Sequence, residues 1–164
     1  MIIDSKKISD SKLKKSIKKG EIIIFPSDGV YIIGCSIDSS SAGKLREIGS
    51  GIAIPTSKQW ITSNFKSKKN YLQKIPGPFV YIFDLKKTSR LKENIRIAIP
   101  SHEFTKKMQK AGKTIFAVQL DARNIRNISK KIKDLADIII DDGFLEGNSL
   151  AVIDLREKVA KIVR

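Results

Sequence analysis

The sequence predicts one α+β (α/β) domain of 164 residues, built on a mixed β-sheet with helices packed against it. Three observations predict this fold class. The length fits a single domain. Amphipathic helical segments alternate with short apolar runs typical of buried strands. The last two apolar runs are separated only by "REK", which indicates a terminal hairpin. We therefore expect one domain over residues 1–164, with both parallel and antiparallel strand pairs.

Helices are expected where apolar residues recur with helical spacing between a capping residue and a glycine. The first begins at Ser9 or Asp10, buries Leu13 and Ile17, and ends at Gly20. The remaining predicted helices follow the same logic, and they cover 39–48, short segments within 57–75, 102–112 and 127–136.

Strands are expected where β-branched and aromatic residues form short runs bounded by turn residues. The run "EIIIF" is continuous rather than alternating, so it predicts a strand buried on both faces. In chain order, the predicted strands are 21–25, 31–35, 52–55, 79–85, 95–100, 114–120, 137–141, 150–155 and 159–163.

The net charge of +15 and the pI of about 9.9 favour an anionic partner. Aromatic residues hardly interleave with the lysines, which argues against a stacking platform for single strands and favours backbone contacts to structured RNA. Solvated helix faces would explain the same charge without any partner. The lysine-rich segments are 12–19, 66–70, 106–110 and 130–133.

Several kinds of site are excluded or disfavoured by the residue inventory. Cys35 and His102 are single residues of their types, so an intrachain disulfide and a Cys/His zinc site are excluded. Cys35 lies in an apolar strand pattern and is expected in the core. No apolar run approaches the roughly 20 residues that span a bilayer, and the N-terminal segment lacks a signal-peptide pattern. We expect a cytoplasmic protein with no membrane association.

Two short motifs invite a phosphate or metal interpretation. "AGKTIF" contains Gly-Lys-Thr, but the earlier glycine of a phosphate loop is replaced by Lys107, and a helix precedes where a strand should. "IIDDG" with Glu146 could bind a divalent cation, although an acidic turn after a strand explains it better. We predict no tightly bound metal.

The stretch "FPSDGVYIIGC" (25–35) is the best candidate site by physical reasoning alone. Pro26 ends a strand because it cannot donate to a β-ladder. Ser27 and Asp28 then lie at the carboxyl end of that strand, where open α/β sheets bind ligands, and the Tyr31 phenol is expected to return toward the same place. No catalytic residue is assigned.

"KKGEIIIFPSDGVYIIGCSID" (18–38) resembles the opening of the YrdC-like family of threonylcarbamoyl-AMP synthases. That family shows Gly, an apolar strand, and then Pro-Thr-(Asp/Glu)-Thr-Val-Tyr-Gly-Leu-Gly. The similarity continues in the family's order through "IPGPFVYIF", "IRIAIPSHEFTKKM", "LADIIIDDG" and "GNSLAVIDL".

The resemblance implies a single YrdC-like domain, a twisted mixed sheet with a basic concave groove. It also implies condensation of L-threonine, bicarbonate and ATP into threonylcarbamoyl-AMP and pyrophosphate, with Mg²⁺ arriving as the ATP complex. The product would pass to a downstream threonylcarbamoyl transferase that modifies tRNA. Some family members bind double-stranded RNA. The threonine pocket would include Ser27, Asp28 and Tyr31.

Several family positions are changed in this sequence. The phosphate-binding Lys-x-Arg of the family aligns with residues 49–51, and its strand arginine aligns with Ala98. The family's Ser-x-Asn aligns with Gln119 and Asp121, and its Ser-Thr pair aligns with Leu150 and Ala151. In a diverged but active synthase, other cations would replace the lost ones, and the candidates are Lys44, Arg46, Lys58, Arg96 and Arg123. The alternatives are a catalytically degenerate module that binds double-stranded RNA or tRNA, and a protein-binding scaffold.

Overall fold

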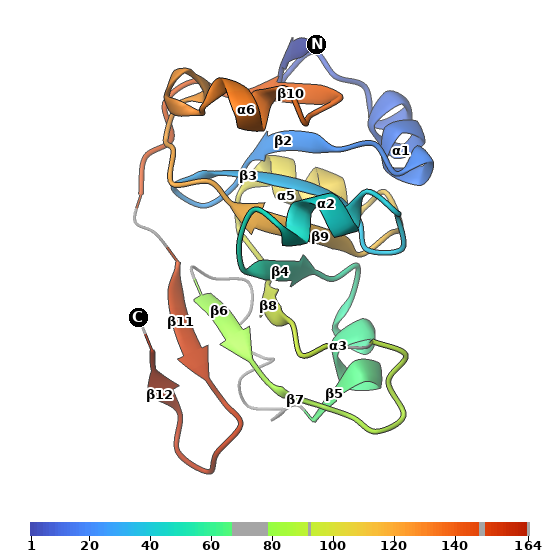
Figure 1. The fold of residues 1–164 in the computed structure, drawn as a ribbon, viewed down its shortest axis with the longest axis vertical. Coiled ribbons are helices and arrows are strands. Elements are labelled where there is room, and N and C mark those ends of the chain that lie inside the picture. Colours follow the sequence, from blue (N-terminus) through green and yellow to red (C-terminus); the bar gives the residue numbers. More distant parts are fainter. Residues whose placement is uncertain (67–78, 92, 148–149, 164) are drawn as a thin grey trace.

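The computed structural model describes residues 1–66, 79–91, 93–147 and 150–163 (Figure 1). Within these residues, ten strands form one mixed sheet, and β5 (Phe65–Lys66) and β7 (Asp84–Leu85) form a second, two-stranded sheet. From edge to edge, the large sheet contains β1 (Ile2–Asp4), β10 (Ile138–Asp141), β2 (Ile23–Pro26), β3 (Tyr31–Ser36), β9 (Ile115–Gln119), β4 (Gly51–Ile54), β8 (Arg96–Ala98), β6 (Phe79–Ile82), β11 (Ala151–Asp154) and β12 (Lys161–Ile162). This mixed sheet confirms the predicted fold class.

Helices cover both faces of the sheet (Figure 1). On one face, α1 (Asp10–Lys19) and α5 (Glu103–Gln109) pack Leu13 and Phe104 against a core that includes Ile32. On the other face, α2 (Ala42–Arg46) packs Leu45 against a core that includes Ile33. The other helical segments are α3 (Lys58–Asn64), the 3-10 turn η1 (Ile125–Asn127) and α6 (Lys130–Lys133).

Three parallel strands, β1, β10 and β2, form one edge region of the sheet. Their carboxyl ends are Asp4, Asp141 and Pro26, so the loops after these residues meet at one end of the sheet. The direction then reverses, because β2 pairs antiparallel with β3, and β3 with β9. At the far edge, β11 and β12 form the antiparallel hairpin that the sequence predicted.

Most predicted elements are present, with shifted ends. Ser9 accepts a hydrogen bond from the Lys12 amide at 3.3 Å, and Gly20 has a φ of +75°, so α1 begins and ends where its capping residues predicted. Cys35 is buried, as expected, and burial raises the pKa of its thiol to about 11. The strand predicted over 79–85 is divided into β6 and β7, and β1 was not predicted. Part of the predicted helical region 57–75 lies outside the described residues.

Candidate functional site

The polar stretch between β2 and β3 forms a tight turn. The two strands stay paired up to Pro26 and Tyr31, and the Ser27 amide donates to the Val30 carbonyl at 3.0 Å. Gly29 adopts a φ of +74°, a conformation that favours glycine. The turn therefore closes a hairpin, and its side chains point in different directions.

The three residues expected in the threonine pocket have different surroundings. The Ser27 side chain is buried, and its hydroxyl has no hydrogen-bond partner among the described residues. The Asp28 carboxylate accepts hydrogen bonds from the Ser101 amide at 2.8 Å and from its hydroxyl at 3.1 Å. Asp28 therefore ties the turn to the segment that leads into α5.

Tyr31 belongs to the core on the α2 face of the sheet. Its hydroxyl donates to the Gly143 carbonyl at 2.8 Å and accepts from the Asp142 amide at 2.9 Å. Burial raises its pKa to about 12. The phenol thus holds the turn after β10 instead of lining either of the clefts described below, and its contact with an amino acid stays a prediction.

A cleft of about 290 Å³, which we call the Arg96 cleft, lies where β8, β9 and β11 approach the β2–β3 turn. Arg96, Gln119 and Asp121 are its polar residues, and Arg96 is half-buried. The Gln119 amide nitrogen is buried without a partner in the described part of the chain. The full lining is Val30, Arg96, Gln119, Leu120, Asp121, Leu150 and Val152.

Strand register and packing leave no room at Gly51 for the arginine of the Lys-x-Arg motif. Gly51 pairs with Val118, so its side-chain direction is that of Val118, whereas Gln119 pairs with Ile32 and faces the opposite side. A Cβ at Gly51 would lie 2.3 Å from the Phe116 ring. That ring fills the space that a longer side chain would need.

The five cations proposed as replacements lie in different places. Among them, Arg96 is the one that lines the described cleft. The Arg46 guanidinium lies 4.6 Å from the Phe116 ring centroid, on the α2 face, and its Nε is 2.6 Å from a Glu93 carboxylate oxygen. The other three are exposed on separate elements, and they are Lys44, Lys58 and Arg123.

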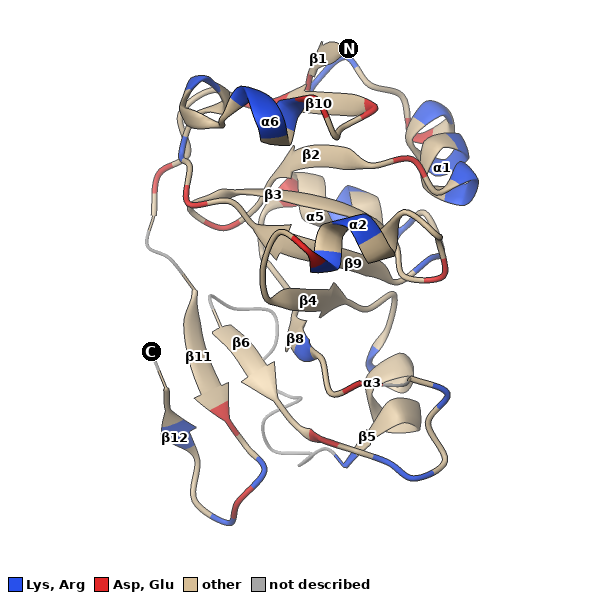
Figure 2. Cartoon of the chain, in the orientation of Figure 1, with Lys and Arg blue, Asp and Glu red and all other residues tan. Residues whose placement is uncertain are grey.

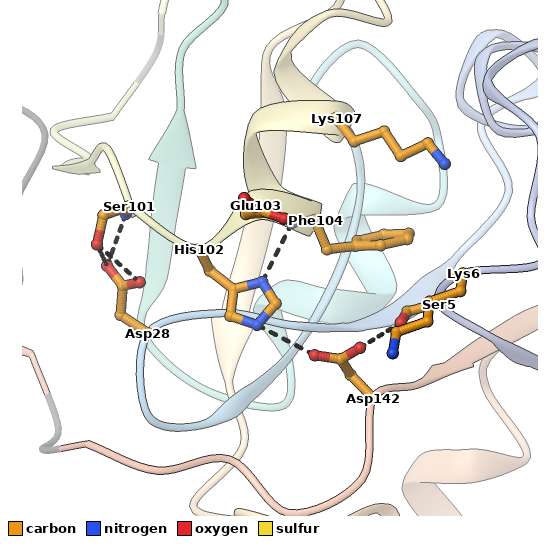
Figure 3. A pocket seen from close by; sticks show the side chains of 9 residues that line it. All are labelled: Ser5, Lys6, Asp28, Ser101, His102, Glu103, Phe104, Lys107 and Asp142. Carbon is orange, nitrogen blue, oxygen red and sulfur yellow. Dashed lines mark hydrogen bonds and ion pairs between the residues drawn. The ribbon is translucent and has the colours of Figure 1, made fainter.

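A second cleft, of about 610 Å³, opens at the carboxyl ends of β1, β10 and β2 (Figure 3), and we call it the His102 cleft. His102 Nδ1 accepts from the Phe104 amide at 3.2 Å, and Nε2 lies 3.4 Å from Asp142 Oδ2. Ser5 donates to the same carboxylate. Sequence reasoning missed this cluster because its members come from three separate loops. Its lining is Ser5, Lys6, Asp28, Ser101, His102, Glu103, Phe104, Lys107 and Asp142.

The positive charge of the chain lies mainly outside these two clefts. Figure 2 shows basic residues on α1, α2 and α6 and along the loop after β7. The described lining of the Arg96 cleft holds one arginine and one aspartate, and that of the His102 cleft holds two lysines and three carboxylates. Within the described residues, no group of three His, Cys, Asp or Glu side chains is placed to hold a metal ion. In the same part of the chain, every helix is too short or too polar to cross a membrane.

This mixed sheet with its flanking helices matches solved structures of the YrdC-like fold. P. abyssi Sua5 superposes with a TM-score of 0.84 at 20% identity over 100% of this chain. The crystal structure of P. abyssi Sua5 complexed with L-threonine gives a TM-score of 0.83. This chain spans 59% of the first Sua5 chain and 57% of the second.

The uncharacterized protein YciO of E. coli K12 is 23% identical over 173 residues, which cover 90% of this chain and 84% of YciO. Its crystal structure gives a TM-score of 0.74 over 100% of this chain and 92% of that chain. HypF in its phosphate- and nucleotide-bound form gives 0.71 at 12% identity, over 94% of this chain and 28% of HypF. No family model matches the chain. These similarities establish the YrdC-like fold.

Proposed function

We propose that this protein is a threonylcarbamoyl-AMP synthase-like enzyme of the cytoplasm that supplies tRNA threonylcarbamoyladenosine modification. It would convert L-threonine, bicarbonate and Mg²⁺-bound ATP into threonylcarbamoyl-AMP and pyrophosphate, for use by a downstream transferase. One observation carries the proposal. Val30, Gln119, Asp121 and Leu150, which the resemblance aligns with separate family motifs, line a single cleft.

The charges of this cleft suit the two ends of an amino acid. Arg96 and Asp121 make no side-chain hydrogen bond or ion pair with the described residues, so both are available to a ligand. The guanidinium would bind the α-carboxylate, and the Asp121 carboxylate would bind the α-ammonium. The unpartnered Gln119 amide would donate a further hydrogen bond to the ligand carboxylate.

The reaction requires two bond exchanges. The α-ammonium first loses one proton to solvent. The amine then attacks the carbon of bicarbonate, the N–C bond forms, and the bicarbonate hydroxyl leaves with a second nitrogen proton as water to give a carbamate. A carbamate oxygen then attacks the α-phosphorus of ATP, and pyrophosphate leaves as the Pα–O bond breaks. Neither step needs a protein nucleophile. Arg96 is the one cation in the described lining, so the Mg²⁺ that accompanies ATP would neutralise most of the phosphate charge.

Isothermal titration of the full chain with L-threonine and with Mg²⁺-bound ATP tests this proposal, together with pyrophosphate release in the presence of bicarbonate. Arg96→Ala should weaken amino-acid binding about 10- to 100-fold, because it removes a charge-assisted hydrogen bond. Arg126→Ala removes the same charge from an exposed position on η1 and should leave affinity unchanged. Absence of heat with both ligands would eliminate the proposed activity.

The net charge of +15 supports a second candidate, a degenerate module that binds tRNA or double-stranded RNA. Its exposed lysines on α1 and α6 would contact phosphates. About five such contacts predict a slope near −4 in a plot of log affinity against log salt concentration. A flat slope would exclude RNA as the partner of these lysines.

A further inference from the structure

Resting on the RNA-binding candidate above, we propose that the exposed face of α1 is the surface that docks duplex RNA. Its lysines would contact both phosphate backbones that border the minor groove of the duplex. In the described linings of the Arg96 and His102 clefts there is no residue of α1, so this surface is separate from both. The lysine-rich helix α6 packs Ile132 against the opposite face of the sheet, so α1 and α6 do not form one surface.

The solvent side of α1 carries an unbalanced positive charge. Its sequence, DSKLKKSIKK, contains five lysines and one acidic residue, Asp10. Leu13 and Ile17 are buried, whereas all five lysines are exposed, and none of the five forms an ion pair with a described residue. Like charges four residues apart on a helix repel each other. The free protein therefore keeps a self-repelling face that a polyanion would neutralise.

The lysines form two rows, one on each flank of the helix. Helical spacing places Lys12, Lys15 and Lys19 in one row, and Lys14 with Lys18 in the other. The first row borders a hollow of about 300 Å³ beside β10. Lys14 borders a separate hollow of about 210 Å³ beside α5. The two rows therefore lie on different sides of the exposed face.

Positive charge dominates both hollows, which together are lined by six lysines and three carboxylates. Two of the carboxylates are engaged within the fold. Asp10 lies 3.1 Å from the Lys107 ammonium, and Asp137 accepts a hydrogen bond from the Ile22 amide at 2.8 Å. The third carboxylate of the described linings is Glu21.

Two rows of cations on one helix fit a ligand with two anionic strands. A-form RNA has a wide, shallow minor groove with a phosphate backbone on each side. With its ten residues, α1 is about 15 Å long, and a helix with its side chains is about 10–12 Å across. It can therefore lie in this groove with one row toward each backbone. A single strand would contact one row alone, and α1 has no aromatic residue on which bases could stack.

The composition of α1 favours a nucleic-acid backbone over a protein or a membrane. Protein interfaces are enriched in aromatic residues, Met and Arg and depleted in Lys, and α1 contains lysine but none of the enriched types. A helix that binds a membrane buries its apolar face in lipid. In α1 that face is already in the core, where Leu13 and Ile17 are each 1% exposed.

Two double variants of the full chain, one for each row, test the proposal. Lys15→Gln/Lys19→Gln and Lys14→Gln/Lys18→Gln each remove one pair of like charges four residues apart, so neither should lower the melting temperature. Each should weaken binding of a blunt RNA duplex about 10- to 100-fold at low salt. Each should also reduce the slope of log affinity against log salt concentration by about two, because two phosphate contacts are lost. Fluorescence anisotropy of a labelled duplex measures both quantities.

The matched control is Lys87→Gln/Lys158→Gln, which removes the same charge from exposed positions. These residues lie on the loop after β7 and on the turn between β11 and β12. Figure 1 shows both segments at the end of the molecule opposite α1. The control should bind the duplex within about twofold of the unsubstituted chain.

The outcomes separate this inference from the candidate function on which it rests. Failure of the unsubstituted chain to bind the duplex would overturn both. Duplex binding that the α1 variants weaken no more than the control does would overturn docking on α1 and leave RNA binding standing. Loss in one row alone would overturn contact with two backbones. Tighter binding to phosphatidylserine vesicles than to the duplex would overturn RNA as the partner. Losses in both α1 variants, with the control unchanged, support the inference.

Discussion

The two clefts of this protein differ in whether their charged side chains have partners among the described residues. In the His102 cleft, Asp142 is engaged by Ser5 and His102, and Asp28 by Ser101. Lys107 donates to the Ile8 carbonyl at 2.8 Å and lies 3.1 Å from Asp10. In the Arg96 cleft, the side chains of Arg96 and Asp121 make no such contact with the described residues.

This difference separates structural from functional polar groups. A polar side chain that is satisfied within the protein contributes to folding, and its removal costs stability. A charge left unpaired in a cleft contributes little to folding and is available to a ligand. The larger cleft is therefore a weaker candidate for the substrate site than the smaller one. Each variant below should lose either stability or ligand affinity, but not both.

Tyr31→Phe should give the largest loss of stability. The change leaves the Gly143 carbonyl and the Asp142 amide without their hydroxyl partner, which should cost about 1–3 kcal/mol in urea unfolding. Because the folded-state pKa of about 12 exceeds the ordinary value of 10, Tyr31 contributes stability that is complete below pH 10 and lost between about pH 10 and 12. Tyr31→Phe should therefore lack this loss of stability between about pH 10 and 12.

Amino-acid affinity provides the control for Tyr31→Phe. The Tyr31 hydroxyl contacts the turn after β10 and does not line the Arg96 cleft, so the dissociation constant should stay within about twofold. A tenfold loss of affinity with unchanged stability would mean that Tyr31 contacts the ligand and does not serve a structural role.

The sequence predicted most elements because their signals are local. Ser9 and Gly20 mark the ends of α1 within a few residues of its apolar face, and continuous apolar runs marked β2 and β10. The strand β1 lacked such a signal. It is three residues long, and it is fixed by pairing Ile3 with Ile140, far away in the chain.

Asp142→Ala should give a smaller loss, about 1 kcal/mol, because the group is partly exposed and its bonds are partly screened. It removes the acceptor of the Ser5 hydroxyl and the partner of His102. Thermal unfolding measures the loss. Glu103→Ala, an exposed carboxylate of the same cleft, serves as the control and should change stability less. Equal effects of the two variants would show that the network around Asp142 does not stabilise the fold.

Arg96→Ala should change the free energy of unfolding by no more than about 0.5 kcal/mol, although it weakens ligand binding. Its side chain makes no hydrogen bond or ion pair with the described residues, so folding loses little when it is removed. Urea unfolding without ligand measures this difference. A loss above about 1 kcal/mol would mean that Arg96 is structural, and the contrast between the clefts would fail.

The candidate site was predicted only in part, because side-chain direction depends on register. The stretch at Ser27 to Tyr31 does lie beside the Arg96 cleft, through Val30. The tight turn sends Tyr31 to the opposite face of the sheet, and no local signal fixes that choice. Arg96 was one of five candidate cations, and its selection required the pairing of β8 with β4 and of β4 with β9.

The smallest effect should come from the Asp154–Arg156 charge pair at the end of β11, which lines neither cleft. Hydrogen bonds from Arg156 lower the pKa of Asp154 to about 2, below its ordinary 3.8. A lowered folded-state pKa contributes stability that is present above about pH 4 and lost as the pH falls toward 2. Asp154→Asn should therefore lower the melting temperature slightly at pH 7, and its difference from the unsubstituted chain should shrink as the pH falls from about 4 to 2. Because the Arg156 side chain is about half exposed, solvent screens this pair, and its contribution should be smaller than that of Asp142. If Asp154→Asn lowers the melting temperature more than Asp142→Ala does, the contacts of Asp142 in the His102 cleft stabilise the fold no more than a surface ion pair does.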